Sequence, residues 1–245
     1  MKDEANFYKR TADEKIYLEN RFEKPKETMK QIVSLLNLDA EHICSEEFTL
    51  LDIGTATGEF LYHIRKSNPK IILDGIEFSD KLVDHSKDFL SKFNIALEQG
   101  DANNLEFIPD NKYNFVTSLG VTSIFEDFRP AYSEMIRVAK DRGICINSMI
   151  VNEGDVDVKI QYKTQTSKGY ESGWNKFSIK SIGDFLSQHD RVEKFEFIKH
   201  TMPFDLPKQS DIMRSWTTYD INGNRILWNG LNMEITLYHV VFYLK

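Results

Sequence analysis

Apolar residues along the middle of the chain follow two alternating patterns. Short continuous apolar runs end at glycine or polar residues, and between them apolar residues recur at every third or fourth position. The first pattern is typical of buried strands and the second of amphipathic helices. The predicted strands are residues 48–53, 71–77, 96–99, 113–118 and 144–150, and the predicted helices are residues 59–65, 79–93 and 131–139. Strands separated by helices predict a parallel sheet that is covered on both faces.

Both ends of the chain depart from this alternation. Helical spacing extends over residues 12–38, where we expect Pro25 to separate two helical segments. Towards the other end, residues 180–189 predict a helix, and residues 192–200 and 234–244 alternate as strands do. We expect these last two strands to pair in antiparallel fashion.

Two long segments, residues 153–179 and 201–233, are polar and carry several aromatic side chains. Loops of this length in a compact domain usually form lids or binding surfaces. No repeat or linker divides the chain, so we predict one domain. In it, residues 1–47 form a helical N-terminal segment, residues 48–152 form the core, and the two long segments form the substrate side.

The composition is that of a globular protein and narrows the set of partners. The 245 residues are 41% hydrophobic and 28% charged, which suits a buried core. The net charge of −7 and the scattered basic residues argue against nucleic acid as a partner, because phosphate binding needs clustered positive charge. A charged start and the absence of a long apolar stretch predict no membrane insertion and a cytoplasmic protein, as a monomer or homodimer.

The two cysteines predict no metal site. Cys44 and Cys145 have neither the CxxC spacing nor a nearby pair of histidines that a zinc site needs. Cys145 lies within an apolar run, so we predict a small buried core residue rather than a nucleophile.

The clearest chemical signal lies where the first predicted strand meets the following helix. Residues 51–58 read Leu-Asp-Ile-Gly-Thr-Ala-Thr-Gly. Glycine at positions 54 and 58 lets the backbone turn sharply and approach a ligand more closely than a side chain would allow. A tight connection without a ligand is the alternative interpretation of such a turn.

Two acidic residues strengthen the case for a ligand. Glu77 ends the second strand, and Asp101 follows the third, so a parallel sheet places both at the edge that carries the glycine turn. There Glu77 is suited to accept hydrogen bonds from both hydroxyls of a ribose, and Asp101 to accept one from the amino group of an adenine. The alternatives are a solvated acid beside the helix start at Ser79 and a simple Gly-Asp turn.

In four separate motifs, over roughly residues 49–152, the chain resembles the class I S-adenosylmethionine-dependent methyltransferases. Residues 51–58 resemble the first motif of that family, residues 75–79 the ribose motif, residues 100–102 the adenine motif, and residues 113–118 the fourth strand. The passage from Arg137 to Gly143 is also similar. The resemblance implies an α/β, doubly wound, mostly parallel seven-stranded sheet with an antiparallel C-terminal strand and lid-like insertions.

The resemblance also implies S-adenosyl-L-methionine as cofactor, S-adenosyl-L-homocysteine as product, and a set of binding residues. One departure is Ala56, where the family more often has glycine. Tyr17 and Arg21, in the N-terminal helical segment, are candidates for the cofactor carboxylate. The full set is Tyr17, Arg21, Asp52, Gly54, Thr55, Ala56, Gly58, Glu77, Phe78, Asp101, Ala102, Leu119 and Gly120.

Transfer of the methyl group to a hydroxyl is helped by a general base that removes the hydroxyl proton, and histidine suits this role at neutral pH. His200 ends a predicted strand and is our first candidate. Glu126 and Asp127, just beyond the fourth strand, are the alternatives. Each has an ordinary interpretation as a surface side chain.

Candidate contacts to the acceptor lie in the longer polar segment. Arg214 is suited to a phosphate or carboxylate, Trp216 and Tyr219 to covering the acceptor, and Asn229 to a sugar or amide. We expect O-methylation of a small polar metabolite such as a sugar or sugar nucleotide. N-methylation of an amine and methylation of protein or RNA remain as alternatives.

Two other classes of function remain open. A nicotinamide-dependent oxidoreductase also uses a glycine turn and an acid at the end of the second strand. A silent binding protein with the same fold is the other, although it has no physical need for Asp52, Glu77 and Asp101.

Overall fold

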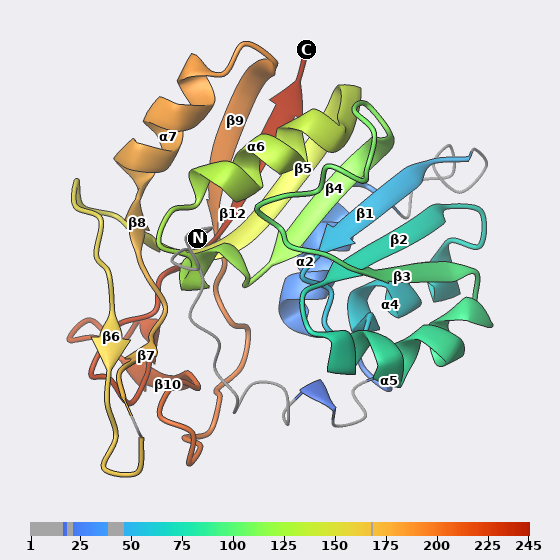
Figure 1. The fold of residues 1–245 in the computed structure, drawn as a ribbon. Helices are drawn as coiled ribbons and strands as arrows, with labels where there is room; N and C mark the ends of the chain where they lie inside the picture. Colours follow the sequence, from blue (N-terminus) through green and yellow to red (C-terminus); the bar gives the residue numbers. More distant parts are fainter. Residues whose placement is uncertain (1–16, 19–21, 39–46, 168) are drawn as a thin grey trace.

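A mixed β-sheet forms the centre of the molecule (Figure 1). The computed structural model describes residues 17–18, 22–38, 47–167 and 169–245. Within them, the main path of the sheet has the strand order β3-β2-β1-β4-β5-β12-β9, and β8 pairs with the end of β5. The strands are β1 (Thr49–Ile53), β2 (Ile72–Glu77), β3 (Ile95–Gln99), β4 (Tyr113–Leu119), β5 (Ala139–Asn152), β8 (Phe177–Ser178), β9 (Val192–Lys199) and β12 (Leu237–Leu244).

The direction of the strands agrees with the prediction. β3, β2, β1, β4 and β5 pair in parallel, and β12 is antiparallel to both β5 and β9. β9 therefore runs in the same direction as the parallel strands. The mostly parallel sheet with an antiparallel C-terminal strand is confirmed.

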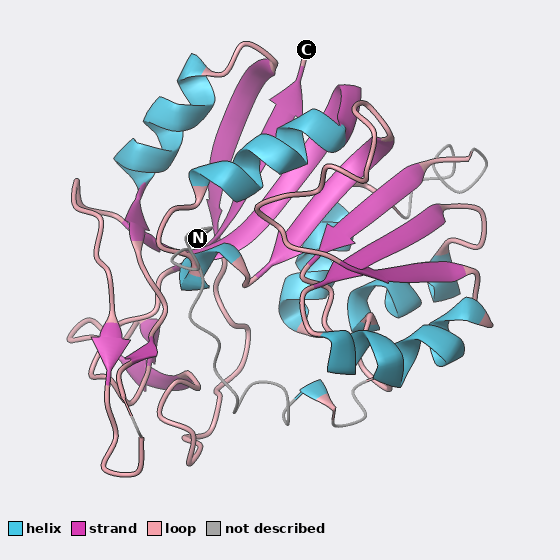
Figure 2. Ribbon diagram, viewed as in Figure 1, coloured by secondary structure: helices cyan, strands magenta, loops and turns pink. Residues whose placement is uncertain are grey.

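Helices cover both faces of the sheet (Figure 2). The face with α2, α4 and α5 buries one apolar cluster, which includes Ile32, Phe60 and Leu90. The opposite face, with α6 and α7, buries another that includes Tyr132 and Leu186. The helices are α2 (Glu27–Leu35), α4 (Glu59–Ser67), α5 (Asp80–Ser91), α6 (Arg129–Val138) and α7 (Ile179–Gln188).

Two regions refine the prediction from periodicity. Residues 22–26 form no helix, and α2 begins just after Pro25, because proline lacks the N–H that a continuous helix requires. The predicted loop 201–233 contains an antiparallel hairpin of β10 (Trp216–Tyr219) and β11 (Arg225–Trp228). These strands are too short for their alternation to stand out in the sequence.

The long segments gather beyond one edge of the sheet. β6 (Gln161–Tyr162) pairs with β7 (Glu171–Ser172), and in Figure 1 this pair lies with β10 beyond the carboxyl ends of the parallel strands. We call residues 201–236, between β9 and β12, the lid. Across the described ranges, no helix combines the length and the apolar character that crossing a bilayer requires.

Candidate functional site

A cavity of about 390 Å³ lies at the carboxyl ends of the parallel strands. One side, which we call the strand side, consists of Tyr17, Gly54, Ala56, Glu77, Phe78, Ser79, Leu82, Gly100, Asp101, Ala102, Leu119, Gly120 and Val121. The other side, the lid side, consists of Ser123, Ile124, Phe125, Met149, Ile150, Trp174, Met202, Leu206, Arg214, Ser215, Leu227, Ile235 and Leu237. A single space thus joins the strand ends to the lid.

The turn after β1 is built so that only glycine fits at two positions. Gly54 has φ +71°, and a Cβ atom added there would lie 2.2 Å from a methyl carbon of Val121. Gly58 has φ +78°, and its Cβ would lie 2.4 Å from a methyl carbon of Leu90. The amide N–H groups of Gly54 and Thr55 both donate to the carbonyl of Ile76. This pairing fixes the turn against the end of β2.

Ala56 adopts a left-handed backbone conformation inside this turn. Its φ is +53°, a value that costs an L-residue free energy because its Cβ crowds a carbonyl oxygen. Glycine has no such cost. The departure from the family pattern at this position therefore keeps the turn but strains it.

Glu77 lies beside the turn, as the sequence predicts. Its Oε2 accepts the amide N–H of Ala56 at 2.9 Å, and its Oε1 accepts that of Ser79 at 2.9 Å. The carboxylate lines the cavity, next to the half-exposed ring of Phe78. Glu77 thus connects the glycine turn with the start of α5 and presents negative charge to the cavity.

Asp52, Thr55 and Gly58 lie behind the cavity rather than in its wall. Asp52 is 1% exposed, and Thr117 Oγ1 donates to its Oδ1 at 2.7 Å. Burial raises the pKa of Asp52 to about 7. These residues support the turn from beneath.

The third strand also delivers its predicted acid to the cavity. Asp101 Oδ1 accepts the backbone N–H and the side-chain amide of Asn103, both at 2.9 Å. Ala102, Leu119 and Gly120 line the same wall, and a Cβ at Gly120 would have no heavy atom within 4 Å. Asp101 therefore combines an ordinary turn contact with a place at the cavity.

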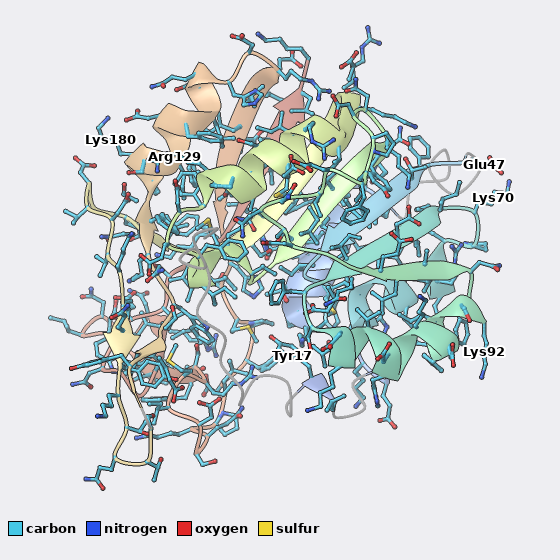
Figure 3. The ribbon with its side chains drawn as sticks, viewed as in Figure 1. Tyr17, Glu47, Lys70, Lys92, Arg129 and Lys180 are labelled. Carbon is cyan, nitrogen blue, oxygen red and sulfur yellow. The ribbon has the colours of Figure 1, made fainter. Side chains whose placement is uncertain are left out.

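Of the two N-terminal candidates, Tyr17 lines the cavity. In the view of Figure 3 it lies below the sheet edge, between the lid and α5. The ammonium of Lys26 lies 5.9 Å from the centre of its ring. Arg21 lies outside the described residues.

None of the three candidate bases lines the cavity. His200 is 5% exposed, and its ring nitrogens contact Gln31 Oε1 and Met202 Sδ. Its strand ends at the expected edge, but the side chain packs towards α2. Glu126 accepts a hydrogen bond from Lys159, and Asp127 accepts two from Arg129 at the start of α6.

His200 and a second buried histidine, His239, belong to one chain of polar contacts through Gln31. His239 Nδ1 lies 2.6 Å from Ser148 Oγ, and its Nε2 lies 3.0 Å from Gln31 Oε1. Because one amide oxygen contacts both imidazoles, each ring must donate to Gln31 from the nitrogen that faces it. Burial lowers the pKa of His200, and lowers that of His239 to about 4. Both rings are therefore neutral at pH 7.

Among the predicted acceptor contacts, only Arg214 lines the cavity. Trp216 packs against the ammonium of Lys208, at 4.7 Å from its ring centre. The Tyr219 hydroxyl donates to Asp205 at 2.8 Å, and buried Asn229 accepts the amide N–H of Leu231. These three side chains stabilise the lid itself.

The lid side contains residues that the sequence analysis did not single out. Trp174, Met202 and Leu227 come from the two long segments, and Phe125 and Met149 from positions beyond β4 and within β5. The available signal was the presence of tryptophan and methionine in otherwise polar loops. Their chain segments meet only in three dimensions, so no spacing in the sequence connects them.

Comparison with known proteins shows which family the chain resembles. The family model described as "Methyltransferase domain" matches residues 44–214, well over half of the chain. A demethylmenaquinone methyltransferase of Deinococcus radiodurans is 28% identical over 106 residues, which cover 42% of this chain and 44% of that protein. The match thus spans less than half of that relative.

Solved structures share the fold. The YcgJ protein of Bacillus subtilis superposes with a TM-score of 0.56 at 18% identity, covering 88% of this chain and 98% of the other. A putative sarcosine dimethylglycine methyltransferase of Galdieria sulphuraria gives a TM-score of 0.55 at 13% identity, covering 88% and 84%. At these identities, the likeness concerns the fold alone.

Proposed function

The chain belongs to the methyltransferase domain family, and we propose that this S-adenosylmethionine-dependent methyltransferase modifies a small molecule with an apolar body. The observation that carries the proposal is one continuous cavity whose strand side has carboxylates and whose lid side does not. The strand side contains three glycines and the carboxylates of Glu77 and Asp101 among apolar groups, whereas ten of the thirteen lid-side residues are apolar and none of the thirteen has a carboxylate. One space thus accommodates a polar cofactor and an apolar acceptor next to each other.

The residues of the strand side fit the cofactor. Gly54 and Gly120 line the cavity, and without a Cβ their backbone permits close contact with a ligand. Glu77 and Asp101 present oxygens for ribose hydroxyls and for an adenine amino group, and Phe78 offers an exposed ring face. When bound, S-adenosylmethionine supplies an electrophilic methyl group at its sulfonium.

The role of the protein is mainly alignment and exclusion of water. In-line displacement requires the nucleophile and the methyl carbon to meet in one geometry, and holding them there supplies much of the rate. Leu119 ends β4, Gly120 follows it, and both line the cavity on its strand side. Aromatic and aliphatic side chains of the lid side, such as Trp174 and Leu227, exclude water from the acceptor.

The apolar lid side favours a different acceptor from the sugar that we expected on sequence grounds. A sugar needs several hydrogen-bonding partners, because burying hydroxyl groups without partners costs free energy. The polar side chains of the lid side are Ser123, Arg214 and Ser215, and its remaining members are apolar. Few polar groups amid apolar walls are typical of sites for apolar small molecules.

Thermal unfolding and methyl transfer together test the proposed function. S-adenosylhomocysteine should stabilise the protein by about 2.7 kcal/mol at a concentration 100 times its Kd, whereas NAD should leave stability unchanged. Incubation with labelled S-adenosylmethionine and fractionated small metabolites should then release S-adenosylhomocysteine. Stabilisation by NAD alone, or turnover only with a protein or RNA fraction, would overturn the proposal.

A further inference from the structure

The lid side of the cavity carries no side chain that accepts a proton at neutral pH, among the residues that the structure describes. Its polar members are two serine hydroxyls and the guanidinium of Arg214. Hydroxyls are too weakly basic for this task, and a guanidinium has no basic lone pair. The carboxylates that line the cavity, Glu77 and Asp101, belong to the strand side.

The nearby titratable groups have partners elsewhere. His200 contacts Gln31 and Met202, and Glu126 pairs with Lys159. Asp211 lies in the lid, but it does not line the cavity, and its Oδ1 accepts the amide N–H of Met213 at 2.9 Å. An acceptor that must lose its proton during transfer would therefore find no group to take it.

Arg214 offers the lid side a positive charge and hydrogen-bond donors rather than a proton acceptor. Its side chain is 23% exposed, and within the described part of the chain it forms one ion pair, in which Nε lies 3.7 Å from Asp211 Oδ2. A guanidinium presents five N–H donors, so this long contact leaves donors for a ligand. Placed in an apolar wall, the cation attracts anions and lowers the pKa of any acid that binds beside it.

We infer that the acceptor is an apolar organic acid that binds as its anion, and that the anionic atom is itself the nucleophile. This inference rests on the proposed function. Carboxylates, thiolates, phenolates and enolates share the required chemistry. The lone pair of the anion forms the bond to the methyl carbon while the carbon–sulfur bond breaks, and that bonding pair stays on sulfur. The charges of anion and sulfonium cancel, and no proton passes to the protein.

Binding of three probes that share a benzyl group and differ in charge tests the preference for an anion. With S-adenosylhomocysteine present, phenylacetate should bind at least about tenfold more tightly than phenethyl alcohol or phenethylamine. Arg214→Met should remove this preference, and Arg214→Lys should retain part of it. Lys208→Met removes the same charge from an exposed lid residue outside the cavity wall and should leave the preference intact. Equal binding of the three probes, or no binding of phenylacetate, would overturn the inference.

Methyl transfer to probes of different acidity tests the nucleophile. At pH 7 thiophenol should be methylated faster than phenol, and benzyl alcohol should not react. The kcat for thiophenol should rise with pH until the bound thiol is ionised, and Arg214→Met should move this rise to higher pH, because the cation lowers the pKa of the bound thiol. Faster methylation of benzyl alcohol would overturn the inference while leaving the proposed function intact. A failure to bind S-adenosylhomocysteine would instead remove the proposed function.

Discussion

A hydrogen bond of 2.9 Å joins the backbone N–H of Ala56, in the turn after β1, to Oε2 of Glu77, the last residue of β2. The contact ties the turn after β1 to the end of β2 at the cavity wall. It therefore couples the shape of the glycine turn to the position of the acid that we assign to the ribose.

Replacing Glu77 tests this assignment. Glu77→Ala should weaken the binding of S-adenosylhomocysteine at least about tenfold, because charge-assisted hydrogen bonds are each worth about 1.5–3 kcal/mol. Calorimetric titration measures the affinity, and circular dichroism should show an unchanged fold. Glu98→Ala removes an exposed acid of the next strand that does not line the cavity, and it should leave the affinity unchanged. Unchanged affinity in Glu77→Ala would remove Glu77 from the site.

The strain at Ala56 predicts a stabilising substitution. Ala56→Gly should raise the free energy of unfolding by about 0.5–1 kcal/mol, because relief of the left-handed strain outweighs the entropy that glycine adds to the unfolded chain. Gly58→Ala is the matched opposite change and should destabilise, since its Cβ would clash with Leu90. Urea unfolding measures both variants. A destabilised Ala56→Gly would show that the turn does not strain alanine.

His239 predicts a loss of stability in acid. Its folded-state pKa of about 4 lies below the ordinary value of 6.5, so the unfolded chain binds the proton more tightly. Stability should fall as pH decreases from 6.5 to 4, by about 3 kcal/mol in total. The stability difference between wild type and His239→Gln should shrink over this range. A constant difference would contradict the prediction.

Asp52 predicts the opposite pH dependence. Its folded-state pKa of about 7 lies above the ordinary value of 3.8, so the folded chain binds the proton more tightly and stability falls as pH rises from 3.8 to 7. Asp52→Asn keeps an oxygen for the Thr117 hydroxyl and should exceed wild type in stability by about 2–4 kcal/mol at pH 8, but not at pH 4. Equal stability at pH 8 would contradict the prediction. Because Asp52 and His239 oppose each other, each effect is visible only as a difference from wild type.

Two tryptophans, Trp174 in the first long segment and Trp216 in the lid, predict a contrast in acceptor binding. Trp174 lines the cavity and Trp216 does not. Trp174→Ala should raise the KM for the acceptor by about tenfold or more, because it removes a large apolar contact, and should leave cofactor affinity unchanged. Trp216→Ala should change the KM by less than about twofold. Steady-state kinetics with the acceptor from the metabolite screen measures both, and a reversed order would contradict the prediction.

The core of the fold was predictable because burial imposes a period on the sequence. β1, β2 and the helices between the parallel strands follow from apolar spacing, and glycine and acid positions at strand ends indicate where Gly54, Glu77 and Asp101 meet. The direction in which a single side chain points was harder to predict. His200 ends its strand at the expected edge, yet it packs against Gln31, because position along a strand does not determine the direction in which the last side chain points.

The lid side was not predictable for a different reason. Trp174, Met202 and Leu227 belong to segments without a repeating pattern, and their meeting depends on how the loops fold back across the sheet edge. The hairpin of β10 and β11 has only a few residue pairs, so its alternation cannot be distinguished from chance.

The two ends of the lid lie side by side. The amide N–H of His200 donates to the carbonyl of Leu237 at 2.9 Å, just where β9 and β12 separate. Residues 201–236 therefore leave the sheet and return to it at neighbouring positions. A segment of another length or composition can close a loop between the same two strand ends. Exchanging residues 201–236 would therefore replace six of the thirteen lid-side residues while leaving every strand-side residue in place.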